Sequence, residues 1–331
     1  MTFVNRAASA AAAACAALLL AACGGGGGGS SGGGGSSGGG SSPYVLFASD
    51  LGSGSIAALT TLAPTAGSTL SANVVEVVPH AGFSLWYDTA RDDLYTLYED
   101  VFSTPTVKVV VFGHAATLKS GAAASRTLVL SDFLAADQLI LDTAHDRMWV
   151  FGSDTQSQSL VEVFDHASTL TGTPVATRVM AIDGQSFAID FGRDILYANP
   201  FANEVAVYTG ASTLAGRVFP TYSIRLVDSR SKLTLDAGRD ILYMSGDNNN
   251  GVTALHNAST ATTGPGTTIN LPAGTATQSV VADPAHDRLY IGAVHGAFVL
   301  DNASTLATGS TQAAEVQAPN AVVQAFAFAG Q

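Results

Sequence analysis

Short apolar runs alternate with polar turns along most of the chain, and the alternation is periodic. Each unit begins with an apolar run too short for a helix, as at 83–87, 139–141 and 187–189. An Asp-rich turn follows, and an aromatic residue then opens a second run. A third run comes at 107–112, 160–164 and 205–208, and a fourth at 127–130 and 176–180. The pattern predicts four antiparallel strands per unit with no amphipathic helix.

Two motifs recur in a fixed order and show that these units are internal repeats. The first reads D-x-[AG]-[RH]-D-x-[LM]-[YW] and begins at Asp88, Asp142, Asp190, Asp236 and Asp283, with spacings of 54, 48, 46 and 47 residues. The second is an A-S-T-L-x-G-like turn that trails each copy, as in 166–172 (HASTLTG). Five paired copies in the same order indicate a repeat architecture.

A four-stranded unit of this length is typical of a β-propeller blade. Innermost strands lie between neighbouring blades, which explains runs that are apolar on both faces. The segment 44–50 has the pattern of a second strand without a first, and 321–329 that of a first strand without a second. Residues 43–331 divided by six give about 48 residues per blade. We therefore predict an all-β, six-bladed β-propeller whose C-terminal strand joins the N-terminal three and closes the ring.

The repeat resembles those of NHL, YVTN and senescence-marker-protein-like propellers, over the whole of residues 43–331. That resemblance implies an architecture rather than an activity, because such propellers include scaffolds, ligand binders and lactonases. Similar lactonases hold a metal with Glu, Asn and Asp at the starts of central strands. The corresponding positions here are Phe83, Gln138, Ser186, Lys232 and Ser279, which lack that trio, so no catalytic residue is carried over.

The N-terminus has the layout of a bacterial lipoprotein signal. Arg6 precedes about sixteen uncharged residues, fewer than the roughly 20 that a spanning helix needs, and Leu20-Ala21-Ala22 stands directly before Cys23. An ordinary signal peptide or an uncleaved anchor is the alternative. Cys15 is disfavoured as the lipidated residue because Ala12 takes the place that Leu20 has before Cys23. We predict a signal peptide over 1–22 and a lipid on Cys23.

Residues 24–42 are thirteen glycines and six serines. Such a chain buries no apolar surface and behaves as a flexible coil, with a span of roughly 25 Å for nineteen residues. The predicted organisation is a signal peptide at 1–22, a lipidated tether at 23–42 and a propeller at 43–331. The predicted location is the cell envelope. By resemblance to enterobacterial lipoprotein sorting, in which Asp after the lipidated Cys retains the protein at the inner membrane, Gly24 implies the outer membrane if the organism is Gram-negative.

The charge balance excludes some partners. The chain has 14 Lys and Arg against 26 Asp and Glu, a net charge of −12. An acidic surface repels nucleic acid and anionic headgroups, so membrane attachment must come from the lipid and tether. No cysteine remains after Cys23, so disulfides do not stabilise the predicted propeller.

Residues that recur in every unit are better explained by folding than by one site. The repeated Asp residues can accept hydrogen bonds from backbone amides two residues further on, and the aromatic residue that follows them is expected to pack between blades. The histidines have no zinc-binding spacing, and Asp247-Asn248-Asn249-Asn250-Gly251 lacks the terminal Glu of a calcium loop. We expect no metal and no cofactor.

The better candidates for function are non-repeated polar residues at the face formed by the second-to-third and fourth-to-first strand loops. These candidate ligand-facing residues are His80, Asp137, Gln138, Gln185, Arg230, Lys232, Gln278, His295 and Asn320. They predict a polar mouth at a central channel; a solvated loop surface is the alternative. We expect a rigid, non-enzymatic platform for a small ligand or an envelope protein. A metal-dependent lactonase-like hydrolase and a structural spacer remain alternatives.

Overall fold

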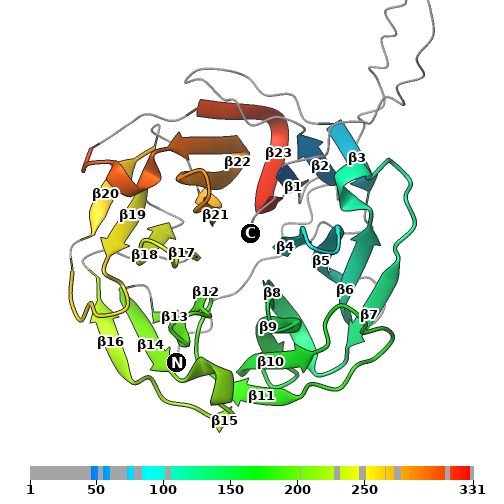
Figure 1. Ribbon diagram of the computed structural model, residues 1–331, viewed down its shortest axis with the longest axis horizontal. Coiled ribbons are helices and arrows are strands. Elements are labelled where there is room, and N and C mark those ends of the chain that lie inside the picture. The colour runs from blue at the N-terminus through cyan, green and yellow to red at the C-terminus, as the bar shows by residue number, and fades with distance from the viewer. Residues whose placement is uncertain are drawn as a thin grey trace, which may run out of the picture. The chain divides into compact units, whose positions relative to one another are not determined.

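The computed structural model describes residues 46–50, 55–59, 73–77, 84–100, 106–201, 203–226, 232–245, 251–264, 266–271, 277–309 and 314–328. They form a ring of β-sheets around a central axis (Figure 1), which confirms the predicted six-bladed all-β propeller. No helix among these residues is long and apolar enough to cross a membrane. The predicted signal peptide, Cys23 and the Gly/Ser tether lie outside the described residues.

Four blades contain four antiparallel strands each in chain order, and the short β15 (Gly216–Arg217) between β14 and β16 joins the sheet of blade 3. Blade 2 contains β4 (Ser84–Asp88), β5 (Asp93–Asp100), β6 (Thr106–Gly113) and β7 (Arg126–Leu130). Blade 3 contains β8 (Phe133–Asp142), β9 (Arg147–Asp154), β10 (Ser159–Asp165) and β11 (Arg178–Ala181). Blade 4 contains β12 (Phe187–Asp190), β13 (Ile195–Phe201), β14 (Glu204–Thr209) and β16 (Tyr222–Arg225). Blade 5 contains β17 (Lys232–Asp236), β18 (Ile241–Ser245), β19 (Gly251–His256) and β20 (Thr267–Asn270).

The remaining two blades share the strand that closes the ring. Blade 6 contains β21 (Thr277–Asp283), β22 (Arg288–Asp301) and the start of β23 (Ala314–Phe328). The end of β23 pairs antiparallel with β1 (Leu46–Asp50), from Leu46 opposite Phe328 to Asp50 opposite Val323. Blade 1 continues with β2 (Ser55–Leu59) and β3 (Asn73–Val77). The predicted closure by the C-terminal strand is therefore confirmed.

The first Asp of each repeat stabilises its own hairpin. This residue is at most 5% exposed in all five copies. One carboxylate oxygen accepts the backbone N–H three residues on at 2.9–3.3 Å, and the other binds the Arg or His at that position at 2.7–2.8 Å. The sequence analysis expected the hydrogen bond to come from the backbone N–H two residues after the Asp. That bond forms at Ala90, which donates to Asp88. The donor found in all five copies is the N–H three residues after the Asp, because the turn is longer.

The second Asp holds a different turn, which sequence reasoning did not foresee. It occupies the left-handed region in every copy, with φ between 52° and 58°, a conformation that Asp tolerates better than most residues. Its carboxylate accepts the backbone N–H of the middle residue of the A-S-T turn at 2.6–3.0 Å. In four blades it also accepts that Ser hydroxyl at 2.7–2.8 Å. The two motifs therefore recur together because they are hydrogen-bonded to each other.

The A-S-T turns begin short 3₁₀ helices, η1 (Ala115–Thr117), η2 (Ala211–Thr213) and η3 (Ala303–Thr305). The Gly that ends the motif then lies beside the outer strand of the preceding blade and bonds to its backbone. Gly172 has φ of 67° and exchanges backbone hydrogen bonds with Thr127 and Val129 at 3.0 and 2.7 Å. At the next junction β15 (Gly216–Arg217) pairs in parallel with β11. These contacts cover sheet edges that would otherwise be open.

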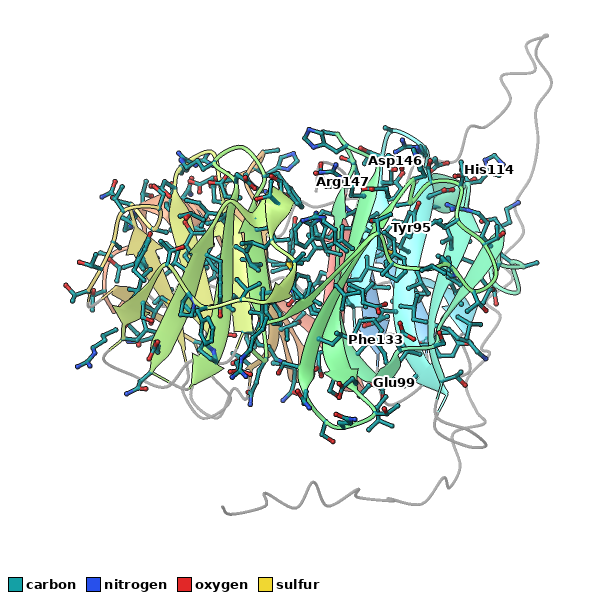
Figure 2. The ribbon with its side chains drawn as sticks, turned by 90° about the horizontal axis from the view of Figure 1, so that it is seen from below. Tyr95, Glu99, His114, Phe133, Asp146 and Arg147 are labelled. Atoms are coloured by element: carbon teal, nitrogen blue, oxygen red, sulfur yellow. The ribbon has the colours of Figure 1, made fainter. Side chains whose placement is uncertain are left out.

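The hydrophobic core lies between neighbouring blades, as the apolar runs predicted. The repeated aromatic residues Tyr95, Trp149, Tyr197, Tyr243 and Tyr290 are at most 2% exposed. Tyr95 packs in the cluster between blades 2 and 3, and Trp149 in the one between blades 3 and 4. Figure 2 shows His114 and Asp146 at one face of the ring and Glu99 at the opposite face, with Tyr95 between them. The repeated turns at His114 and Asp146 therefore lie at the face opposite to Glu99.

Candidate functional site

A cavity of about 550 Å³ lies among the innermost strands of the ring. Its walls come from β4, β8, β12, β17, β21 and β23, so every blade contributes. The volume falls within the range of about 300–1,000 Å³ that is usual for small-molecule sites. This cavity is the central channel that the sequence predicted.

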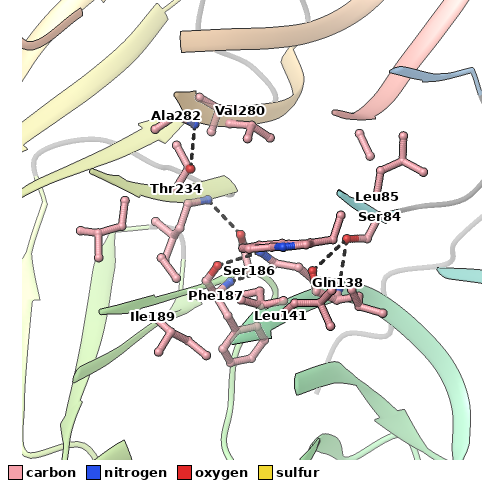
Figure 3. A pocket seen from close by; sticks show the side chains of 18 of the residues that line it. Ser84, Leu85, Gln138, Leu141, Ser186, Phe187, Ile189, Thr234, Val280 and Ala282 are labelled. Carbon is pink, nitrogen blue, oxygen red and sulfur yellow. Dashed lines mark hydrogen bonds between the residues drawn. The ribbon is translucent and has the colours of Figure 1, made fainter. Parts of the chain in front are cut away.

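Polar side chains on the channel wall bind each innermost strand to the next one. Ser84 Oγ accepts a hydrogen bond from the backbone N–H of Leu139 at 3.1 Å and lies 3.2 Å from the carbonyl oxygen of the same residue. Ser186 Oγ accepts a hydrogen bond from the backbone N–H of Leu233 at 2.9 Å. Thr234 Oγ1 accepts Ala282 N at 3.0 Å. Figure 3 shows these bonds around the pocket. They join blade 2 to blade 3, blade 4 to blade 5 and blade 5 to blade 6, and bonds of Gln138 join blade 3 to blade 4.

Gln138 belongs to this set of inter-strand bonds rather than to the open mouth. Its Oε1 accepts Phe187 N and its Nε2 donates to Phe187 O, both at 2.8 Å (Figure 3). The sequence analysis placed Gln138 among the ligand-facing residues because it is polar and begins a central strand. The structure places it on the cavity lining, but its side-chain amide is occupied by the backbone of blade 4.

Four other candidates meet at the cavity. Asp137 and Gln185 are exposed, and Lys232 and Gln278 are half-buried; all four line it. His80 and Arg230 lie outside the described residues. His295 and Asn320 lie within β22 and β23, where their side chains are not described. The predicted polar mouth therefore contains one carboxylate, one ammonium group and two amides among the residues that the structure describes.

Trp86 lines the cavity and was not among the predicted site residues. It packs against the cluster between blades 2 and 3 and against the one between blades 3 and 4. Its indole Nε1 is buried without a hydrogen-bond partner. Two residues before the first Asp, the repeat has Trp86, Ile140, Ala188, Thr234 and Val281, so an aromatic residue at this position was a signal that could have been noticed.

The part of the chain that the structure describes brings no metal-binding group of histidines and carboxylates to the channel. Among the described residues, no three His, Cys, Asp or Glu side chains come together in a way that could hold a metal ion. His145 lines the cavity, and its Nδ1 lies 2.8 Å from Asp142 Oδ2. His286 Nδ1 is likewise 2.8 Å from Asp283 Oδ2. Most of the Asp247–Gly251 segment, considered as a calcium loop, lies outside the described residues.

A second unusual group is Glu162, on β10 away from the channel lining. It is only 3% exposed, and its Oε1 has no hydrogen-bond partner among the described residues. Burial, and then the neighbouring Asp132 carboxylate, raise the pKa of Glu162 to about 7. The neutral carboxyl is therefore the form that the fold favours.

We expect Glu162→Gln to stabilise the protein at alkaline pH. The raised pKa means that the stabilising contribution of neutral Glu162 is complete below its unfolded value near 4.5 and is lost as the pH rises through about 7. Gln is always neutral, so the variant should gain about 1–2 kcal/mol of unfolding free energy at pH 8.5 and little at pH 4.5. Urea unfolding at both values measures this. Asp132→Asn is the control and should move the pH dependence to lower pH; a pH-independent difference for Glu162→Gln would contradict the assignment.

Comparisons with known proteins show the fold and no more. No protein-family model and no curated protein matches the chain. A chain of a nidogen/laminin complex is similar with a TM-score of 0.57 and 15% identity, covering 86% of this chain and 97% of that one. The WD40 β-propeller domain of Doa1 has a TM-score of 0.52 and 9% identity, covering 86% and 83%. A putative 6-phosphogluconolactonase from Bacteroides uniformis has a TM-score of 0.52 and 11% identity, covering 85% and 83%.

These three solved structures share one architecture with this chain. Identities of 9–15% support the β-propeller fold and transfer no activity. The function of this chain therefore has to be argued from its own channel and its own N-terminus.

Proposed function

We propose that this protein is a membrane-tethered, extracytoplasmic lipoprotein whose propeller is a rigid, non-enzymatic binding platform. The observation that carries the binding role is the 550 Å³ cavity, at which Asp137, Gln185, Lys232 and Gln278 come together. Concave sites with apolar walls and a few convergent polar groups are where proteins bind small molecules.

The wall of the channel supports binding rather than bond cleavage. Ser84, Gln138, Ser186 and Thr234 all use their side-chain polar atoms on the backbone of the next blade. A hydroxyl or amide held in this way keeps the walls in place. Because the walls are fixed before a ligand arrives, little conformational entropy is lost on binding.

The tether rests on the N-terminal sequence. Leu20-Ala21-Ala22-Cys23 matches the pattern of a lipidation site, and the Gly/Ser segment after it supplies the reach for a domain to stand clear of the headgroups. A net charge of −12 gives the protein no electrostatic attraction to anionic lipid, so attachment depends on the acyl chains.

The tether is tested by comparing two cysteine variants in a bacterial host that processes lipoproteins. Cys23→Ser should abolish incorporation of labelled palmitate and release the protein from the membrane fraction, whereas the matched variant Cys15→Ser should behave as the wild type. Equal labelling of both variants would overturn the assignment of Cys23. The binding role is overturned by a stoichiometric metal together with metal-dependent lactone hydrolysis, which would favour the hydrolase instead.

A further inference from the structure

The central cavity reaches the surface between the first hairpins of blades 3 and 4, at the end of the channel remote from Asp137. The first hairpin of a blade is the turn between its innermost and second strands. Turn residues of these two hairpins line the cavity, namely Thr143, Ala144, His145, Phe191 and Gly192. Ala144, His145 and Gly192 are exposed to solvent as well. Among the other hairpin turns that the structure describes, blade 6 contributes the half-buried Pro284, and blades 2 and 5 contribute no turn residue to the lining.

Neighbouring hairpins on this face are bonded to each other by the Arg at the fourth position of the repeat. Arg193 Nη1 donates to Ala237 O of blade 5 at 2.7 Å, and Arg239 Nη1 donates to Pro284 O of blade 6 at 2.8 Å. Arg91 Nη2 lies 3.5 Å from a carboxylate oxygen of the second Asp of blade 3. A guanidinium group has five N–H donors on a long side chain, so it reaches the next hairpin while it binds the first Asp of its own blade.

Blade 3 has His145 at this position and no bond of this kind to blade 4, although both hairpins are described in full. His145 Nδ1 lies 2.8 Å from Asp142 Oδ2 of its own hairpin, and the ring forms no bond with blade 4. An imidazole is shorter than an Arg side chain and has a single nitrogen left once the other binds the Asp. The two hairpins that line the cavity are therefore the ones that are not bonded to each other.

Blades 3 and 4 are held together elsewhere. At the other end of the innermost strands, Gln138 exchanges two hydrogen bonds of 2.8 Å with the Phe187 backbone. At the periphery, Arg178 Nη1 donates to Ala211 O at 3.2 Å. A junction that is bonded at one end and unbonded at the other opens most readily at the unbonded end. The hairpins of His145 and of blade 4 can therefore separate without loss of the contacts that hold the two blades together.

We propose that the channel has a second opening for small molecules, between the first hairpins of blades 3 and 4. Its rim is formed by Ala144, His145, Phe191 and Gly192. The opening rests on the binding role proposed above only for its use by a ligand. A ligand of the channel would exchange through it while a partner covers the end at which polar side chains were predicted.

A single thiol in the channel wall can report on the opening, because the chain has no cysteine after Cys23. Ile189→Cys places this thiol at a half-buried position that lines the cavity one residue before Asp190. Cys15→Ser and Cys23→Ser in the same full chain remove the two native thiols, so the result does not depend on lipidation. Methyl methanethiosulfonate, a small uncharged reagent, should modify the thiol of Ile189→Cys at a rate that intact mass spectrometry measures.

Gly192→Trp adds a large side chain to the rim. A Cβ on Gly192 would lie 3.4 Å from Asp190 Oδ1, an ordinary contact, so the backbone accepts the change. The variant should slow modification about fivefold or more, because the reactivity of a thiol depends on access to it. Gly238→Trp is the matched control at the same repeat position of blade 5, where a Cβ would lie 3.5 Å from Asp236 Oδ1 and where Gly238 does not line the cavity. It should leave the rate unchanged.

His145→Arg supplies the missing bond, with Phe191 O as the equivalent acceptor in blade 4. It too should slow modification, whereas His286→Arg, the same change in blade 6, should not. A second reporter, Gln185→Cys, stands at an exposed position at the other end of the channel in place of Ile189→Cys. Its rate should be the same in every background.

The outcomes separate this proposal from the binding role. A rate for Ile189→Cys that neither Gly192→Trp nor His145→Arg lowers overturns the second opening and retains the binding role, because the reagent then enters past Gln185. Equal slowing by Gly238→Trp also overturns the opening. If Gln185→Cys is modified and Ile189→Cys never is, the channel is closed to small molecules and both proposals fail. A cooperative urea transition identifies the variants that fold, and His145→Arg decides alone if Gly192→Trp does not.

Discussion

Replacing Asp190 by Ala should lower the free energy of unfolding by about 3 kcal/mol, because its buried carboxylate accepts two hydrogen bonds, one from a backbone N–H and one from a charged guanidinium group. Asp190 accepts Arg193 N at 2.9 Å and Arg193 Nη1 at 2.7 Å, and its side chain is only 2% exposed. The same guanidinium donates to Ala237 O of blade 5 at 2.7 Å. Loss of Asp190 therefore releases the hairpin of blade 4 and its contact with blade 5. Urea unfolding followed by circular dichroism measures the change.

Two matched variants show whether burial and charge are the cause. Asp190→Asn keeps one acceptor and loses the charge, so about half of the effect should remain. Asp165→Ala removes a carboxylate that binds Arg147 Nε at 2.8 Å, but in a pair whose side chains are 32% and 36% exposed. Exposed pairs contribute about 1 kcal/mol or less. An Asp190→Ala loss no larger than that of Asp165→Ala would show that the repeated Asp does not stabilise the blade.

The architecture could be predicted because the length of the repeat and its order of apolar runs and turns determine the number and kind of blades. The period, the paired motifs and the two incomplete ends together required a closed ring, and β23 pairs with β1 as they implied. The aromatic residue after the second Asp was expected to pack between blades, and Tyr197 and its equivalents do so. These are features that local pattern and repetition determine.

The hydrogen-bond partners of the repeated Asp residues could not be predicted in the same way. Asp194 and Ser212 are 18 residues apart, and only the folded blade brings the first hairpin next to the A-S-T turn. Blade 2 shows how a sequence difference changes the partners of the second Asp. It has Ala116 where other blades have Ser, and there Tyr87 OH donates to Asp92 Oδ1 at 2.9 Å.

The sequence placed several candidate residues near the axis, but not the hydrogen-bond partners of their side chains. Asp137, Gln185, Lys232 and Gln278 line the cavity as expected of polar residues at the entry of central strands. Gln138 has the same sequence signal, but the spacing between neighbouring blades lets its amide reach Phe187. Trp86 stands in an apolar run and looked like a core residue. Sequence patterns identify which residues are near the axis, whereas side-chain pairing across blades decides which of them remain available to a ligand.

Deleting residues 322–331 should abolish cooperative unfolding, the largest effect that we expect. These residues include the end of β23, which supplies the innermost strand of blade 1. Phe326 is 2% exposed and packs on Tyr290 with ring centroids 5.8 Å apart, and Ala327 is fully buried. The deletion exposes this core and the inner edge of β1, at a cost of about 5 kcal/mol or more when side-chain burial and backbone bonds are added. That is comparable with the whole stability of many domains, about 5–15 kcal/mol.

A rearranged chain shows whether closure itself is what is lost. Phe328 lies opposite Leu46, so three residues after Phe328 and three before Leu46 would join the two strands as a hairpin. Moving residues 322–331 to stand directly before residue 43 should therefore restore a cooperative urea transition, although the chain now ends in blade 6. A deletion variant that unfolds cooperatively, or a rearranged chain that does not, would show that the ring does not depend on this strand. In that case each blade would have to be stable without ring closure. The cores shared between neighbouring blades argue against such independent stability.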